Sequence, residues 1–162
     1  MGNRHGQAPR VSDERLQAAA ATCANAGAAL VYFFGSQASG RPRAESDVDL
    51  AVLLSPKSPR HQYGRIRAQL IAELMTVFES NNVDVVILNE APPLLTYEGV
   101  IRGGWLLLER DRLARIRFEV RAFQEYVDTA PLREIQNRYL KEAIRDRAAA
   151  LSPGETKQRH TW

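Results

Sequence analysis

Apolar and polar residues occur in distinct blocks along the first third of the chain. Ser12 is typical of helix N-caps and Gly27 of helix ends, and between them four apolar residues have helical spacing: Leu16, Ala19, Ala20 and Cys23. Two β-prone apolar runs follow at 29–34 and 48–54, separated by a polar loop that contains Gly and Arg. The pattern predicts one helix followed by two strands, the first of them buried.

The middle of the chain continues the alternation of helix and strand. Apolar residues on one face predict a helix over about 62–80, and the run 83–88 predicts a third strand. The prolines at 92–93 suit the first turn of a short helix, which two glycines close before a fourth strand at 105–109. Trp105 is expected in the core.

Beyond residue 111 apolar residues step by three and four, which is the spacing of an amphipathic helix. The pattern occurs in two segments, which Pro131 separates: Leu113, Ile116, Val120, Phe123 and Val127, then Leu132, Ile135, Tyr139, Ala143 and Ile144. The short connection predicts a helical hairpin. Together these elements predict an α/β (α+β) fold with a C-terminal helical hairpin.

The length of 162 residues fits one ordinary domain with a small appendage. We expect four parts along the chain: a flexible leader at 1–11, a core at 12–110, a helical extension at 111–150 and a disordered tail at 151–162.

Composition excludes several classes of protein. No apolar run approaches the roughly 20 residues of a membrane helix, and residues 1–10 lack an apolar signal core, so we expect a cytoplasmic protein. Cys23 is the single cysteine, which excludes an internal disulfide and any multi-cysteine zinc site. Its alanine-rich surroundings predict a small buried hydrophobe rather than a reactive thiol.

The net charge of +3 hides an uneven distribution. Residues 44–100 carry four basic and eight acidic groups, whereas the flanking segments carry the basic surplus. Within the C-terminal helices, Arg115–Glu119 and Arg121–Glu125 are expected to pair and to absorb part of the positive charge. Aromatic residues are not interleaved with the arginines, so direct nucleic-acid binding is not expected. The acidic centre is the more informative feature.

The segment 34–54 reads FGSQASGRPRAESDVDLAVLL and combines three features. Gly35 and Ser36 follow a predicted buried strand, where glycine allows close backbone approach and serine offers a hydroxyl and an N–H to a phosphate. After ten intervening residues, Asp47 and Asp49 open the next strand, and strand alternation points both side chains the same way. Two adjacent carboxylates suit a hard cation such as Mg²⁺, which prefers carboxylate and phosphate oxygens. These parts fit a metal–nucleotide–phosphate site better than a hydrolytic triad.

Asp84 is an acidic residue inside the otherwise apolar run 83–88. A buried carboxylate is costly unless it is paired or binds metal. If the third strand lies beside the second with Asp84 level with Asp47 and Asp49, three carboxylates converge. Two divalent ions and one activated acceptor hydroxyl could then serve in-line attack on a phosphate. A residue at the edge of the sheet is the alternative interpretation of Asp84.

The chain resembles the nucleotidyltransferase superfamily of the DNA polymerase β type, and within it the minimal nucleotidyltransferase (MNT) antitoxins of HEPN–MNT toxin–antitoxin pairs. The resemblance covers roughly residues 12–150 and includes Asp84 at the third-acid position. The other motif residues that carry it are Gly35, Ser36, Gly40, Arg41, Ser46, Asp47, Asp49 and Leu50.

The resemblance implies a polymerase β-like mixed sheet flanked by helices and an enzyme that uses ATP with Mg²⁺, two ions being expected. It implies transfer of AMP to a tyrosine of a cognate HEPN ribonuclease, which silences that toxin. Gly35 and Ser36 would bind the triphosphate, Asp47 and Asp49 the metals, and Asp84 would complete one metal site and assist deprotonation of the acceptor.

Several alternatives stay open from the sequence. Arg41 either neutralises the triphosphate as a nucleotide-binding residue or lies in solvent. The arginine-rich helices are either solvated faces or a docking surface for the toxin, and a homodimer or a hetero-oligomer with the toxin is possible. The chain could also be a non-catalytic antitoxin that acts by occlusion, or a nucleotidyltransferase that acts on RNA or a small molecule.

Overall fold

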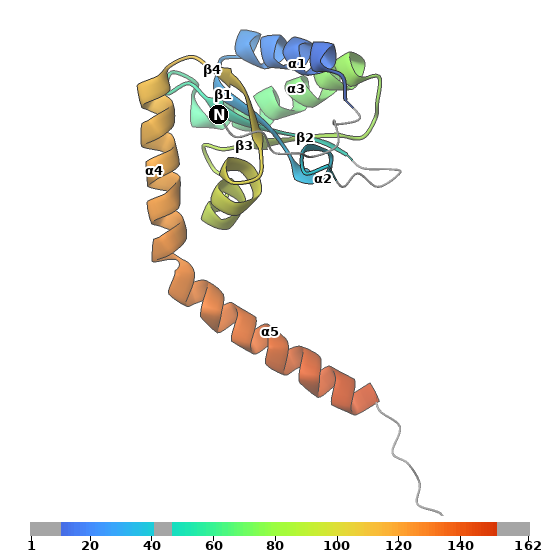
Figure 1. Ribbon diagram of the computed structural model, residues 1–162, viewed down its shortest axis with the longest axis vertical. Helices are drawn as coiled ribbons and strands as arrows, with labels where there is room; N and C mark the ends of the chain where they lie inside the picture. Colours follow the sequence, from blue (N-terminus) through green and yellow to red (C-terminus); the bar gives the residue numbers. More distant parts are fainter. Residues whose placement is uncertain (1–10, 41–46, 152–162) are drawn as a thin grey trace, which may run out of the picture. The chain divides into compact units, whose positions relative to one another are not determined.

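The computed structural model describes residues 11–40 and 47–151, and side chains are described as far as residue 147. A four-stranded sheet has the order β3-β2-β1-β4 and is flanked by helices (Figure 1). In chain order the elements are α1 (Asp13–Asn25), β1 (Ala28–Phe34), α2 (Gly35–Ala38), β2 (Val48–Leu54), η1 (Arg60–Gln62), α3 (Tyr63–Phe78), β3 (Val83–Ile87), η2 (Leu95–Ile101), β4 (Trp105–Glu109), α4 (Arg112–Asp128) and α5 (Ala130–Leu151). The predicted mixed sheet with flanking helices is confirmed.

The sheet is mixed because β1 pairs antiparallel with β2 and β4, whereas β2 pairs parallel with β3. A parallel pair needs a crossover connection, and helix α3 supplies it. The N-cap of α1 is as predicted, since the Ser12 side chain accepts a hydrogen bond from the Arg15 N–H. The described part of the chain contains no helix that is both long and apolar enough to cross a membrane.

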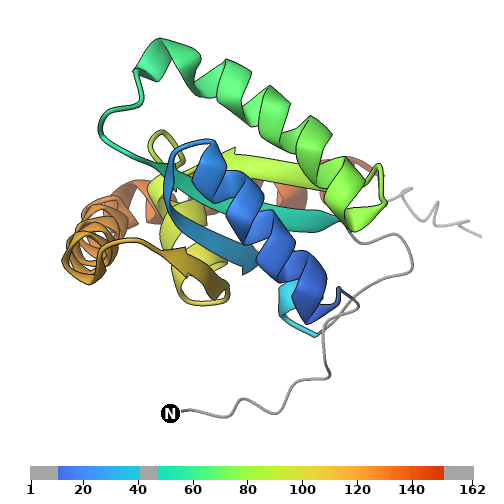
Figure 2. The ribbon, with the colours of Figure 1, turned by 90° about the horizontal axis from the view of Figure 1, so that it is seen from above.

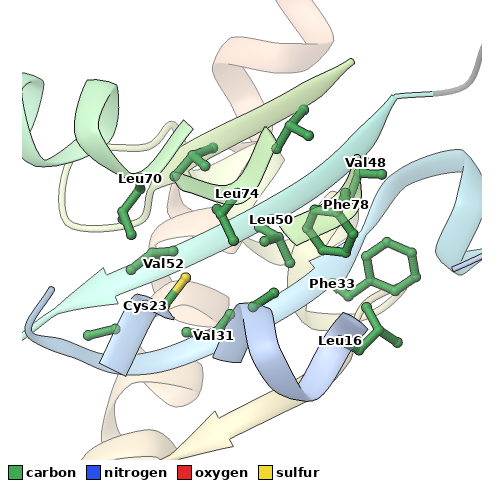
Figure 3. Close-up of a cluster of buried hydrophobic side chains, with 14 of the residues drawn as sticks. Leu16, Cys23, Val31, Phe33, Val48, Leu50, Val52, Leu70, Leu74 and Phe78 are labelled. Atoms are coloured by element: carbon green, nitrogen blue, oxygen red, sulfur yellow. The ribbon is translucent and has the colours of Figure 1, made fainter. Parts of the chain in front are cut away.

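Helices α1 and α3 lie side by side over one face of the sheet (Figure 2). Their apolar faces meet alternate residues of the strands, among them Val31, Leu50 and Val52 (Figure 3). Cys23 is fully buried in this cluster, as predicted. Burial is the main reason why the pKa of its thiol is raised to about 12, and the charge of Glu73 adds to the effect. This face of the sheet is closed by packing.

The opposite face is covered by η2 and by the first part of α4. Phe118 of α4 joins a second buried cluster with Leu30 and Tyr32 of β1. The Tyr32 hydroxyl donates to Oε1 of Glu119 at 2.8 Å, and the same carboxylate pairs with Arg115. The predicted Arg115–Glu119 pair is therefore confirmed, and so is Arg121–Glu125 at 3.9 Å.

The predicted short helix after the two prolines is also present, but η2 has π-helical geometry.

Trp105 is not in the core, so that prediction was wrong. Its strand, β4, is an edge strand, and the Trp105 side chain is 42 % exposed. The ring still contacts Phe33 edge to face, with ring centres 6.2 Å apart. A tryptophan at a sheet edge has one side to pack against and the other toward solvent.

The chain divides into two compact units, and the boundary falls after Tyr126. Most of α4 therefore belongs with the sheet, while α5 belongs to the second unit. Both predicted C-terminal helices are present, but their packing as a hairpin remains a prediction. The predicted leader and tail lie almost wholly outside the described residues, and the predicted boundary at residue 110 stays a prediction.

Candidate active site

The parallel pairing of β2 and β3 brings two of the predicted acidic residues together. Asp49 lies directly opposite Asp84 in the register, and the Val48 N–H donates to the Asn82 carbonyl at 2.9 Å just before this point. Both carboxylates occupy the face of the sheet that also carries Ala51 and Val86, because side chains alternate along each strand. The third strand thus lies beside the second with Asp84 level with Asp49, as the convergence of carboxylates required, and β3 is also the edge strand of the alternative interpretation, so the role of Asp84 remains a prediction.

The surroundings of Asp49 disfavour the charged form of its carboxyl group. Burial raises its pKa, and the charges of Asp47 and Asp84 raise it further, to about 6. Asp47 itself precedes β2 and is exposed. A partly buried carboxylate between two others is a poor place for a negative charge and a good place for a cation.

Gly35 allows the Asp49 carboxylate to occupy its position. We call Asp49 and Asp84 the acidic pair. The last residue of β1, Phe34, pairs with Asp49, so Gly35 lies beside this member of the pair. Its φ of 80° is in the left-handed region, and a Cβ at this position would collide with Oδ2 of Asp49 and lie 3.0 Å from its Cγ. We expected Gly35 to allow a phosphate to approach the backbone; the structure shows that Gly35 also makes room for a catalytic-site candidate.

Ser36 stands in the four-residue helix α2, directly after β1. The turn is held by the Ser39 N–H, which donates to the Gly35 carbonyl at 3.1 Å, and by the Ser39 hydroxyl, which donates to the Ser36 carbonyl at 3.0 Å. Phosphate binding by Gly35 and Ser36 remains a prediction. Arg41, Ser46 and the loop between them lie outside the described residues.

Sequence reasoning missed Arg67, which the structure places at this site. Its Nη2 donates to Oδ1 of Asp84 at 2.8 Å, and its Nε donates to the Val85 carbonyl at 2.6 Å. Arg67 belongs to α3, which otherwise packs on the other face of the sheet. No local pattern indicated this contact, because it depends on how α3 lies across β3.

The donor set fits Mg²⁺ in the way that nucleotide enzymes use it. Within residues 11–40 and 47–151, no three His, Cys, Asp or Glu side chains are grouped closely enough to hold one ion. Mg²⁺ is commonly bound by one or two carboxylates together with substrate phosphates rather than by an all-protein cage. Asp49 and Asp84 on neighbouring strands, with Asp47 two residues before Asp49, match that mode. The metal-binding roles of these residues remain predictions.

The sheet is mixed and has helices on both faces. It carries paired carboxylates next to a glycine–serine turn, which is the arrangement typical of nucleotidyltransferase folds. Residues 19–113 match the family Polymerase beta, Nucleotidyltransferase. The match spans more than half of the chain, so the chain belongs to this family. None of the curated proteins compared with the chain matches it.

Several solved structures that are similar to this chain come from toxin–antitoxin complexes. A chain of a toxin–antitoxin with AMP-PNP is 23 % identical, with a TM-score of 0.62 over 76 % of this chain and 98 % of that one. A chain of the MntA–HepT toxin–antitoxin is 21 % identical, with a TM-score of 0.61 over 80 % and 99 %. A third, from the tri-AMPylated Shewanella oneidensis HEPN toxin in complex with MNT antitoxin, is 22 % identical, with a TM-score of 0.56 over 77 % and 98 %. These likenesses show the fold.

Proposed function

We propose that this chain is a cytoplasmic antitoxin that neutralises a HEPN toxin by transferring AMP from ATP to a tyrosine hydroxyl of that toxin. The observation that carries the proposal is the register that sets Asp49 opposite Asp84, with Gly35 at the end of the adjacent strand. Family membership supports nucleotide transfer. The AMP-PNP complex and the AMPylated HEPN toxin among the solved structures of this fold support ATP as donor and a protein as acceptor.

In the proposed reaction the chain's own residues bind the nucleotide, hold the metal ions and accept a proton from the acceptor hydroxyl. Gly35 and Ser36 bind the triphosphate, Arg41 adds positive charge beside it, and Asp47, Asp49 and Asp84 would hold two Mg²⁺ ions. When bound, Mg²⁺ supplies neutralisation of the phosphate charge.

The acceptor oxygen bonds to the α-phosphorus, and the bond from that phosphorus to the oxygen bridging the β-phosphate breaks. Pyrophosphate leaves, and Asp84 takes the hydroxyl proton.

A second candidate function is neutralisation by binding alone. Helix α4 carries an exposed apolar stripe, which we define as Leu113, Ile116, Val120 and Phe123. Exposed apolar stripes of this kind are typical of protein–protein contact sites. An antitoxin that covers its toxin through this surface would need no chemistry at Asp49.

The two functions differ in their dependence on the carboxylates. We expect wild-type protein with ATP and Mg²⁺ to add AMP to a HEPN toxin encoded by the neighbouring gene, as measured by mass spectrometry of the toxin. The double variant Asp47→Asn/Asp49→Asn should add none and should fail to protect cells. Glu14→Gln is the matched control, because it removes an exposed carboxylate from α1 on the other face of the sheet.

Protection by the double variant equal to that of wild type would establish occlusion as the mechanism. Mass analysis of RNA and small metabolites after the same reaction separates the third alternative. A modified RNA or metabolite with an unmodified toxin would refute the proposed acceptor.

A further inference from the structure

Arg67 reaches the acidic pair around the free edge of the sheet. Among the strands that the structure describes, β3 is an edge strand, hydrogen-bonded to β2 on one side only. Arg67 starts from α3 and donates from Nε to the Val85 carbonyl and from Nη2 to Asp84. One planar guanidinium therefore holds a backbone carbonyl of β3 and an acidic side chain of the same strand in fixed relation.

The two oxygens of Asp84 are in different situations. Oδ1 accepts from Arg67 at 2.8 Å and from the Val85 N–H at 2.8 Å. Among the described residues nothing donates to Oδ2. The carboxylate is thus held by one oxygen, and the other remains available to an ion or an acceptor hydroxyl.

Stability does not account for this contact. Both side chains are about half exposed, 49 % for Arg67 and 50 % for Asp84, and exposed ion pairs contribute little to the free energy of folding. Outer partners of metal-binding carboxylates, in contrast, strongly influence metal affinity and activity because they fix the orientation of the ligand.

We propose that Arg67 is a positioning residue for Asp84, one that orients the carboxylate so that Oδ2 serves the metal and the acceptor hydroxyl. The proposal rests on the function proposed above, since it assigns Asp84 to that reaction. It differs from a simple counter-charge, which would neutralise Asp84 without orienting it.

The test uses Arg67→Met in the full chain, with Arg65→Met as the matched control. Arg65 lies in the same helix, is exposed, and forms no ion pair among the described residues. We expect Arg67→Met to lower kcat for AMP transfer by at least about tenfold, with KM for ATP within about twofold of wild type. Arg65→Met should change neither constant, and both variants should keep the wild-type circular dichroism spectrum.

A second readout does not need the reaction. Mn²⁺ binding, followed by electron paramagnetic resonance, should weaken about tenfold in Arg67→Met. In an Asp84→Asn background the same substitution should cause no further loss, because Arg67 acts through Asp84. Tighter Mn²⁺ binding by Arg67→Met would identify Arg67 as a competing cation and overturn the proposal, and so would unchanged binding or losses that multiply in the double variant. If wild type transfers no AMP, the proposed function fails while the Mn²⁺ titration still decides the role of Arg67.

Discussion

Replacing Asp49 by asparagine should stabilise the metal-free protein at neutral pH. Burial and the charges of Asp47 and Asp84 raise the pKa of Asp49 from its usual value of 3.8 to about 6. Between these values the folded chain binds the proton more tightly than the unfolded chain does. The free energy of unfolding therefore falls as pH rises through this window and stays lower above it. Asparagine has the same shape but never ionises, so it avoids this loss.

The shift of about 2 pH units corresponds to about 3 kcal/mol at 1.36 kcal/mol per unit. Part of the carboxylate contacts solvent, which screens the interaction, so we expect about 1 to 2 kcal/mol at pH 7.5. At pH 3.5 most of the Asp49 carboxyl is protonated in both states, and the difference between wild type and variant should nearly vanish. Mg²⁺ should narrow the gap at pH 7.5, because a ligand that binds only the folded wild type stabilises it.

The assay is urea unfolding followed by circular dichroism, in EDTA and in Mg²⁺, at both pH values. Asp47→Asn should reproduce part of the effect, since it removes one of the two charges that act on Asp49. Glu14→Gln, on the other face of the sheet, should show no comparable pH-dependent gain. A difference between wild type and Asp49→Asn that stays constant from pH 3.5 to pH 7.5 would refute the electrostatic reasoning.

Gly35→Ala should lower the free energy of unfolding, measured with urea, by about 1 to 2 kcal/mol because of the positive φ. It should also abolish Mn²⁺ binding, because the added Cβ displaces the Asp49 carboxylate; retained Mn²⁺ affinity would contradict this. Tyr32→Phe should lower the free energy of unfolding by about 1 to 2 kcal/mol through loss of the hydrogen bond to Glu119, and a variant as stable as wild type would show that the bond contributes nothing. Cys23 should resist alkylation by iodoacetamide at pH 8 until urea unfolds the chain, since burial raises its pKa; rapid labelling of folded protein would disprove its burial.

Much of the fold was predictable because each local pattern agreed with the tertiary structure. The strands β2 and β4 begin and end at the predicted residues. Gly35, Asp49 and Asp84, which the structure places close together, were also singled out as candidates, since carboxylates within apolar strands and a glycine after a buried strand have few structural explanations. Their side-by-side placement required only that the third strand lie next to the second.

The remaining features depend on tertiary arrangement that no short segment encodes. Trp105 looked like a core residue because nothing in its neighbourhood indicates that β4 lies at the edge of the sheet. In the π-helical geometry of η2, hydrogen bonds join residues five apart rather than four, a difference too small to be read from apolar spacing. The Arg67–Asp84 contact passes around a free strand edge, so neither residue's own surroundings predict it.

The position of Asp84 on an edge strand also bears on local unfolding. Within the described sheet β3 is hydrogen-bonded to one neighbour only, so its opening is a smaller fluctuation than the opening of the central pair β1 and β2. Such an opening would separate Asp84 from Asp49 while leaving Gly35 and its strand in place. Hydrogen exchange at the β3 amides therefore reports directly on the integrity of the acidic pair. Ligands that bridge β2 and β3 would slow that exchange by tying the outermost strand to the rest of the sheet.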